Sequence, residues 1–224
     1  MTDASIAARQ YAPATQRNRE FILDVLVQVL PTTGTVLEVS SGTGEHAIFF
    51  AAQLSPRKWL PSDPNPIARA SISAWQTHSP SPNLYPPIDL DASQPIWSIE
   101  SLPLPAPLLQ TDFAPATINA IVNINMIHIA PWEACLGLMA GAKRILPAGG
   151  VLYLYGPYKQ NGQHTAPSNE LFDESLRSQN AAWGVRDLET VVETAAKNQL
   201  ALLKTVAMPA NNLSVVFEKI KGEC

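Results

Sequence analysis

Residues 35–47 read Thr35-Val36-Leu37-Glu38-Val39-Ser40-Ser41-Gly42-Thr43-Gly44-Glu45-His46-Ala47. An apolar run typical of a buried strand leads into a glycine turn, and a helical pattern begins directly after it. Gly42 and Gly44 let the backbone turn sharply and leave amide groups uncovered, so that a ligand can bind between the strand end and the helix start. This stretch predicts an α/β fold with a nucleotide-like cofactor at the turn.

The acidic residues around the turn indicate which cofactor fits. The glycine spacing also satisfies the G-x-G-x-x-A form of the dinucleotide fingerprint, so the glycines alone leave NAD and other adenosine ligands open. Glu38 lies near the strand end and Glu45 in the first helical turn, where a pyrophosphate requires a positive field. Two acids there favour a cofactor with a positive centre and no phosphate, and S-adenosylmethionine is such a molecule.

Composition predicts a single domain over residues 1–224 with a small-molecule substrate. A chain of 224 residues with 46% hydrophobic content can bury one substantial core. The net charge of −4, without a basic run, argues against a nucleic-acid partner. Cys135 and Cys224 lie far apart in the sequence, so neither a disulfide framework nor a metal site is expected. No stretch approaches the roughly 18 apolar residues of a membrane span, and a cytoplasmic protein is expected.

Strand and helix patterns alternate through five strands, and the chain then ends in a helix and a hairpin. The expected helices cover about 15–30, 45–54, 67–77 and 135–146, with one more after Asp187; the expected strands cover 36–39, 59–60, 84–90, 118–124, 151–155, 200–208 and 213–219. We interpret residues 1–34 as an N-terminal helical cap. The polar segment 156–186 is too long for a plain connector, and we interpret it as a lid over the substrate site.

Several residues outside the turn are candidates for binding and catalysis. Asp63 follows Gly44 by nineteen residues, a spacing that puts a carboxylate at the tip of the second strand, within reach of ribose hydroxyls. Arg17 is a candidate for holding the cofactor carboxylate or an anionic substrate. His128, whose ordinary pKa lies near neutrality, is the candidate base. The candidate walls of the substrate pocket are Tyr155, Tyr158, Asn169, Trp183 and Arg186.

The order of these elements resembles that of the class I S-adenosylmethionine-dependent methyltransferases over nearly the whole chain. The resemblance implies a single Rossmann-like α/β fold: a seven-stranded, mostly parallel sheet with a reversed strand in a C-terminal hairpin and helices on both faces. Five motifs resemble more narrowly the methyltransferase-like 26 family, whose substrate is not established. They are Arg17-Asn18-Arg19-Glu20, residues 37–46, Pro61-Ser62-Asp63, Asn125-Met126-Ile127-His128-Ile129 and Trp183-Gly184-Val185-Arg186-Asp187.

The resemblance adds roles to individual residues. Asp91 or Asp89, after the third strand, is expected to accept a hydrogen bond from the adenine amine. Asn125 begins the loop that faces the transferable methyl group in that class, and we place it with His128 as catalytic. The full set of predicted cofactor-binding residues is Arg17, Glu38, Ser40, Gly42, Gly44, Asp63, Asn65, Asp91 and Asn125.

The sequence therefore predicts an S-adenosylmethionine-dependent methyltransferase that acts on an unidentified, small acceptor. The chemistry needs alignment and exclusion of water more than acid or base. Two alternatives stay open at this point: a non-catalytic module that binds the same cofactor and acts through a protein partner, and an NAD-binding oxidoreductase. The acids Glu38 and Glu45 and the terminal hairpin count against the oxidoreductase.

Overall fold

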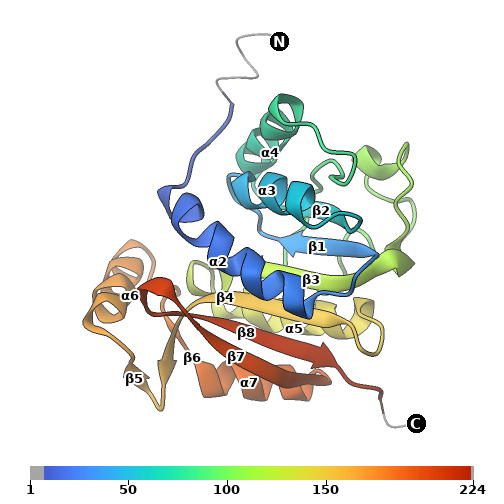
Figure 1. The fold of residues 1–224 in the computed structure, drawn as a ribbon. Coiled ribbons are helices and arrows are strands. Elements are labelled where there is room, and N and C mark those ends of the chain that lie inside the picture. The colour runs from blue at the N-terminus through green and yellow to red at the C-terminus, as the bar shows by residue number, and fades with distance from the viewer. Residues whose placement is uncertain (1–7, 223–224) are drawn as a thin grey trace. The chain divides into compact units, whose positions relative to one another are not determined.

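The structure, a computed structural model, describes residues 8–222 (Figure 1). The first seven residues of the predicted N-terminal cap and Cys224 lie outside this range. The described chain divides into two compact units, the first made of the residues up to Asp91 with Ile96–Val122, the second of Ala92–Pro95 and the residues from Asn123 on. The single domain expected from chain length stays a prediction.

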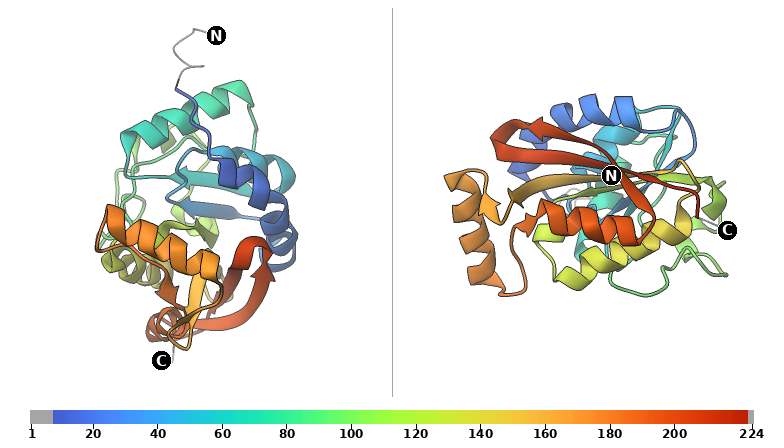
Figure 2. Two further views of the ribbon diagram at one scale, coloured as in Figure 1. Left: turned by 90° about the vertical axis from the view of Figure 1, so that its left-hand side faces the viewer. Right: turned by 90° about the horizontal axis from the view of Figure 1, so that it is seen from below.

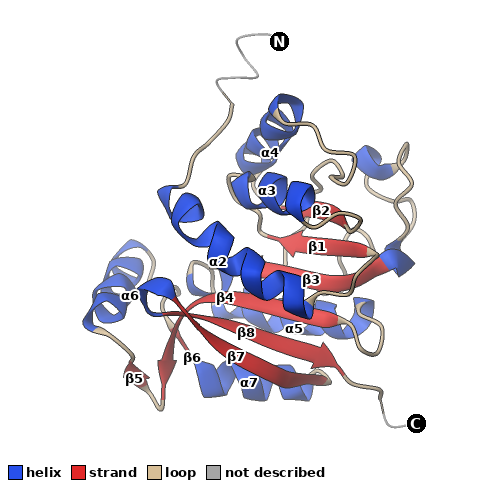
Figure 3. Cartoon of the chain, in the orientation of Figure 1, coloured by secondary structure: helices blue, strands red, loops and turns tan. Residues whose placement is uncertain are grey.

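The first unit contains the predicted strand, turn and helix. Its elements are α2 (Pro13–Val29), β1 (Thr35–Val39), α3 (Glu45–Gln53), β2 (Lys58–Ser62), α4 (Pro66–His78), the short 3-10 helices η1 (Ala106–Leu108) and η2 (Pro115–Thr117), and β3 (Ile118–Ile124), whose last two residues belong to the second unit. Strands β1 and β2 run parallel, with Thr35 paired to Lys58 and Val39 to Ser62 (Figure 3). All five residues of β1 are buried, as a strand covered on both faces requires.

The helices of this unit begin where the sequence allows. Pro13 opens α2 and Pro66 opens α4, positions at which a missing N–H costs nothing. Asn65 caps α4 by accepting a hydrogen bond from the backbone N–H of Ile67 over 2.9 Å. Helix α3 packs on the strands through Phe50, whose ring centroid lies 5.4 Å from that of Trp59.

The segment expected to form a third strand differs from that expectation. The backbone of residues 84–90 pairs with β2 through two isolated parallel bridges, Trp59 to Leu84 and Ser62 to Ile88. Pro86 and Pro87 lie between the bridges and have no N–H to donate, so a continuous ladder cannot form there.

The second unit contains the C-terminal hairpin. Its elements are η3 (Met126–His128), α5 (Trp132–Ile145), β4 (Val151–Gln160), β5 (Gln163–His164), α6 (Pro167–Gln179), β6 (Arg186–Asp187), α7 (Leu188–Lys197), β7 (Leu200–Met208), η4 (Pro209–Asn211) and β8 (Asn212–Lys219). Strand β8 pairs antiparallel with both β4 and β7, which confirms the predicted hairpin. Helix α7 packs against β7 and β4 (Figure 2).

The expected lid, residues 156–186, is largely regular. Strand β4 continues through Gly156 to Gln160, and α6 occupies the middle of the segment. Helix α6 buries Asn169, Asp173 and Leu176. The fold as a whole is mixed α/β, mostly parallel with an antiparallel C-terminal hairpin, and has six α-helices within residues 8–222.

Candidate functional site

The glycine turn of the first unit runs from Ser40 to Gly44 and is held in an unusual backbone conformation. Ser40, Gly42 and Gly44 have φ angles of +59°, +54° and +88°. A Cβ on Gly44 would lie 2.9 Å from the backbone Cα of Ile72, so this position requires glycine. A Cβ on Gly42 would meet no atom within 4 Å, which shows open space beside the turn. A serine in the left-handed region costs about 1 kcal/mol and is common at ligand sites.

Asp63, at the end of β2, lies against this turn. Its carboxylate accepts hydrogen bonds from the backbone N–H groups of Gly42, over 3.0 Å, and of Asn65, over 2.9 Å. Burial raises the pKa of Asp63, and these two hydrogen bonds oppose that shift. Each carboxylate oxygen keeps a free lone pair, so Asp63 has capacity to accept hydroxyl groups.

Glu38 lies beneath the turn and is only 2% exposed. Its Oε2 accepts a hydrogen bond of 2.7 Å from the indole N–H of Trp59. Burial raises the pKa of Glu38 to about 7, although the hydrogen bonds from Trp59 and Ser41 oppose the rise. Glu38 is therefore partly protonated at neutral pH and contributes less negative charge than a surface glutamate.

Glu45 has a partner that the sequence pattern did not indicate. Its Oε2 accepts hydrogen bonds from the backbone N–H of Ala12, over 2.5 Å, and from the hydroxyl of Thr43, over 3.1 Å. The carboxylate thereby ties the segment before α2 to the start of α3. The next residue of α3, His46, contacts Asn18 of α2 over 2.9 Å, and Arg17 is exposed beside it.

Asp89 and Asp91, at the end of the segment that pairs with β2 through isolated bridges, have different surroundings. Asp89 is exposed and its carboxylate lies 3.2 Å from the guanidinium of Arg69. Asp91 is half-buried. Of the predicted cofactor residues, the first unit thus brings Gly42, Asp63 and Asn65 together at the turn, whereas the oxygen of Asn65 caps α4.

The second unit holds both predicted catalytic residues close to Gly156. A Cβ on Gly156 would lie 2.3 Å from Nε2 of His128 and 3.2 Å from Oδ1 of Asn125, so only glycine leaves room for both groups. Asn125 has a φ angle of +64°, and its N–H donates to the carbonyl of Tyr155 over 2.8 Å. Gly156 thus allows an imidazole nitrogen and an amide oxygen to converge.

His128 is fully buried, and its ring is approached edge-on by that of Tyr158, with centroids 5.2 Å apart. Within residues 8–222, neither ring nitrogen of His128 nor the hydroxyl of Tyr158 has a hydrogen-bond partner. Burial lowers the pKa of His128 to about 3, and the charge of Arg186 contributes. The imidazole is therefore neutral, with one donor and one acceptor left for a ligand.

Three further predicted pocket residues, Asn169, Tyr155 and Trp183, also lie in the second unit. Asn169 donates from Nδ2 to the hydroxyl of Thr165, over 3.0 Å, and to the carbonyl of Asn211, over 2.9 Å. Tyr155 is buried and Trp183 is half-buried. These contacts position α6 relative to η4, within the segment predicted to be a lid.

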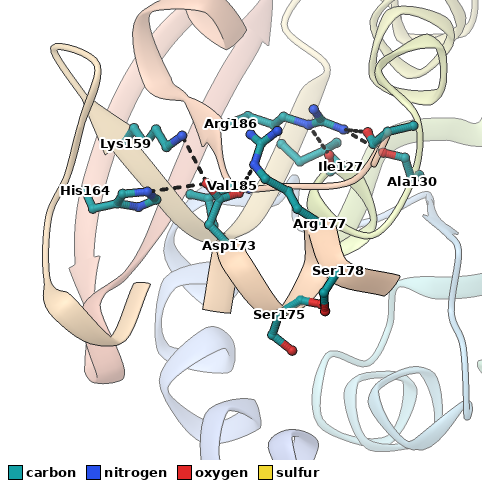
Figure 4. Close-up of polar contacts among 11 residues, drawn as sticks. Ile127, Ala130, Lys159, His164, Asp173, Ser175, Arg177, Ser178, Val185 and Arg186 are labelled. Carbon is teal, nitrogen blue, oxygen red and sulfur yellow. Dashed lines mark hydrogen bonds and ion pairs between the residues drawn. The ribbon is translucent and has the colours of Figure 1, made fainter. Parts of the chain in front are cut away.

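Arg186 binds the turn that carries His128. Its Nε donates to the carbonyl of Ile127 over 2.9 Å, and its Nη2 donates to the carbonyls of Ala130 and Ala182 over 2.7 and 2.9 Å (Figure 4). Because a guanidinium fits two carbonyls at once, Arg186 fixes the backbone on either side of His128.

Sequence reasoning missed a group of charged residues that we call the Asp173 cluster: Asp173, Lys159, His164 and Arg177 (Figure 4). Oδ1 of Asp173 accepts hydrogen bonds from the backbone N–H of Val185, over 2.7 Å, and from Nε of Arg177, over 3.2 Å. Its Oδ2 lies 3.1 Å from Nζ of Lys159 and 3.4 Å from Nε2 of His164. The spacing of four residues between Asp173 and Arg177 was the available signal.

The described chain offers no sign of two other kinds of site. Among residues 8–222, no three His, Cys, Asp or Glu side chains gather so as to hold a metal ion. No helix in that range has the length and apolar character needed to cross a membrane.

Several solved structures that are similar in fold to this chain are methyltransferases. An O-methyltransferase family 2 protein from Planctomyces limnophilus, in complex with apigenin, matches with a TM-score of 0.71 and 19% identity, over 98% of this chain and 62% of that chain. An O-methyltransferase family protein from Burkholderia thailandensis matches with a TM-score of 0.70 and 13% identity, over 94% and 58%. A methyltransferase in calicheamicin biosynthesis, in its SAH-bound form, matches with a TM-score of 0.64 and 14% identity, over 89% and 53%.

The fold is therefore that of the class I methyltransferases, and this chain spans little more than half the length of the structures it matches. Residues 9–219 match the family described as "Protein of unknown function (DUF938)", and the chain belongs to that family.

Proposed function

We propose that this protein is an S-adenosylmethionine-dependent methyltransferase with a small-molecule acceptor, as its resemblance to the methyltransferase-like 26 family also implies. The observation that carries the proposal is the hydrogen bond from the N–H of Gly42 to Asp63 beside open space at the turn. A carboxylate fixed next to uncovered backbone suits the ribose of an adenosyl compound. The complex of the Planctomyces limnophilus O-methyltransferase family 2 protein with apigenin, a small molecule, supports a small acceptor.

The residues at the turn fit that cofactor in charge as well as in shape. Asp63 would accept hydrogen bonds from the ribose hydroxyls, and Gly42 would let the cofactor approach the backbone closely. The carboxylate of Asp63, which faces the turn, disfavours a pyrophosphate there. When bound, S-adenosylmethionine supplies an activated methyl group on a positively charged sulfur.

Residues of the second unit would orient the acceptor and take its proton. Neutral His128 has a free acceptor nitrogen for the proton of an acceptor hydroxyl, and the Asn125 oxygen beside Gly156 would orient the same group. Arg186 would keep the backbone of this turn fixed through the carbonyls of Ile127 and Ala130. An acceptor amine would also have to be oriented by these side chains, but it would not need His128 as a base.

One observation favours a second candidate function, a non-catalytic module that binds the cofactor and acts through a partner. His128 is completely buried and its pKa is lowered to about 3, chiefly by burial. Such a histidine is a weak base, and it also serves as a neutral core residue.

A thermal-shift experiment followed by a transfer assay tests the proposal. We expect S-adenosylhomocysteine, but not NAD, to stabilise the protein, by about 2.7 kcal/mol at one hundred times its dissociation constant. Incubation of metabolite extracts with methyl-labelled cofactor should then transfer label to an acceptor. Stabilisation without transfer would favour the binding module, and stabilisation by NAD alone would refute both.

A further inference from the structure

The Asp173 cluster carries more positive than negative charge. Lys159 and Arg177 share the single carboxylate of Asp173, which leaves one positive charge in excess when His164 is neutral. This excess stands out in a chain whose net charge is −4. A partly buried excess of positive charge favours an anion nearby, because water screens it poorly.

A second guanidinium adds to this excess. Burial lowers the pKa of Arg186, and the charge of Arg177 lowers it further, while Cys135, Asp173 and Glu133 raise it. The hydrogen bonds of Arg186 go to neutral carbonyl groups, so these bonds bring no negative charge to the guanidinium. Two guanidinium groups thus interact unfavourably on this side of the second unit (Figure 4), and an anion would relieve that repulsion.

The cluster also has unused hydrogen-bond donors. Arg177 is 49% exposed on its side chain and donates to Asp173 through Nε alone. In the described part of the chain, its Nη1 and Nη2 have no protein partner. Lys159 is 21% exposed and directs one of its three donors to Asp173. A planar guanidinium with both terminal nitrogens free has the geometry that binds a carboxylate or phosphate in a two-pronged manner.

Gly184 places these donors next to the turn that carries His128. A Cβ on Gly184 would lie 2.8 Å from Nη2 of Arg177, and the N–H of Gly184 donates to the carbonyl of His128 over 2.9 Å. Nη2 of Arg177 therefore lies near Gly184, whose N–H is hydrogen-bonded to the backbone of His128.

Buried polar atoms without hydrogen-bond partners also occur in the second unit. Nδ1 of His164, the hydroxyl of Tyr158 and both ring nitrogens of His128 have no hydrogen-bond partner among residues 8–222. The side chains of His128 and Tyr158 are fully buried. Since nearly all buried polar groups in proteins are hydrogen-bonded, a buried water or a polar ligand is expected to complete these groups.

We propose that the Asp173 cluster binds an anionic group, a carboxylate or a phosphate, on the molecule that the protein methylates. Arg177 provides the paired donors and Lys159 a point charge, while Asp173 holds both side chains in position. That the molecule is a methyl acceptor rests on the proposed function; the anion site itself does not.

Binding of simple anions to the protein without cofactor tests the site. The probes are benzoate and inorganic phosphate, with benzamide as the uncharged control, titrated calorimetrically at constant ionic strength. We expect at least one anion to bind and benzamide not to bind; the tighter anion identifies the group. Arg177→Gln should weaken binding about tenfold or more, since a charge-assisted pair is lost. Lys197→Gln, an equal charge change at the exposed end of α7, should leave it unchanged.

The proposal is overturned if neither anion binds, or if the two substitutions weaken binding equally. Should Arg177→Gln fail to fold, the side-chain Nε resonance of Arg177 in the unsubstituted protein gives the same answer, because benzoate or phosphate must shift it. Failure of methyl transfer would leave this result intact. Conversely, methylation confined to uncharged acceptors would refute an anionic acceptor and leave the methyltransferase assignment standing.

Discussion

The backbone N–H of Gly42 donates a hydrogen bond of 3.0 Å to the carboxylate of Asp63, twenty-one residues further along the chain. This bond joins the turn after β1 to the end of β2. It fixes the carboxylate at the place where the turn has open space, and it is the contact on which cofactor binding is proposed to depend.

Asp63→Asn should weaken cofactor binding more than it weakens folding. An asparagine keeps only one acceptor oxygen, so it cannot serve the N–H groups of Gly42 and Asn65 together and still accept ribose hydroxyls. We expect the dissociation constant for S-adenosylhomocysteine, measured calorimetrically, to rise about tenfold or more, with about 1 kcal/mol lost in unfolding free energy. An unchanged dissociation constant would show that Asp63 does not contact the cofactor.

Gly44→Ala should destabilise the first unit. The added methyl group would meet the backbone Cα of Ile72 at 2.9 Å, and backbone atoms cannot move aside as a flexible side chain can. We expect a loss of about 2–3 kcal/mol in urea unfolding.

Gly149→Ala is the matched control for that change. Gly149 has a similar φ angle, +82°, but nothing lies within 4 Å of its missing Cβ, so only the cost of the backbone conformation of about 1 kcal/mol is expected. Equal losses for the two variants would mean that the contact with Ile72 has no effect.

Glu38 should make the protein less stable as pH rises. Its folded pKa of about 7 lies above its ordinary value of 4.5, mainly because of burial, so the folded state binds the proton more tightly than the unfolded state. The contribution of Glu38 to stability is therefore full below pH 4.5 and is lost between about 4.5 and 7. The loss amounts to about 3 kcal/mol.

Glu38→Gln removes the titration while its amide oxygen still accepts from Trp59. The fall in unfolding free energy between pH 5 and pH 8 should be smaller in the variant than in the unsubstituted protein, by about 2.5 kcal/mol. Urea unfolding at both pH values measures the difference. A parallel pH dependence in the two proteins would show that Glu38 ionises normally.

His128→Gln separates the methyltransferase from the binding module. If His128 takes a proton from the acceptor, the variant should lose a factor of about 100 or more in kcat, because a glutamine cannot act as a base. Binding of S-adenosylhomocysteine should change little and serves as the control for folding. Transfer at an unaltered rate would assign His128 a structural role.

Arg186→Lys should loosen the turn that carries His128. A lysine cannot donate to the carbonyls of Ile127, Ala130 and Ala182 in the fixed geometry of a guanidinium. We expect about 2 kcal/mol lower stability and faster hydrogen exchange in residues 127–130. Exchange in β7 is the internal reference, and an equal increase there would indicate general destabilisation instead.

The sequence alone determined the elements that local patterns encode. The glycine turn after β1, the α/β order and the C-terminal hairpin were predicted because strand, turn and helix signals depend on neighbouring residues. The strand expected over residues 84–90 is the element for which local patterns were not sufficient. Pro86 and Pro87 are expected from the sequence to weaken the third strand, and the structure shows how far: isolated bridges replace a continuous ladder.

Only the tertiary structure decided the partners of the charged groups. Glu45 accepts a hydrogen bond from Ala12, thirty-three residues away, and Asp173 gathers side chains from β4, β5 and its own helix. The burial of His128 likewise depends on packing with Tyr158. Charge and burial at such sites follow from contacts between residues distant in sequence, and no local pattern carries that information.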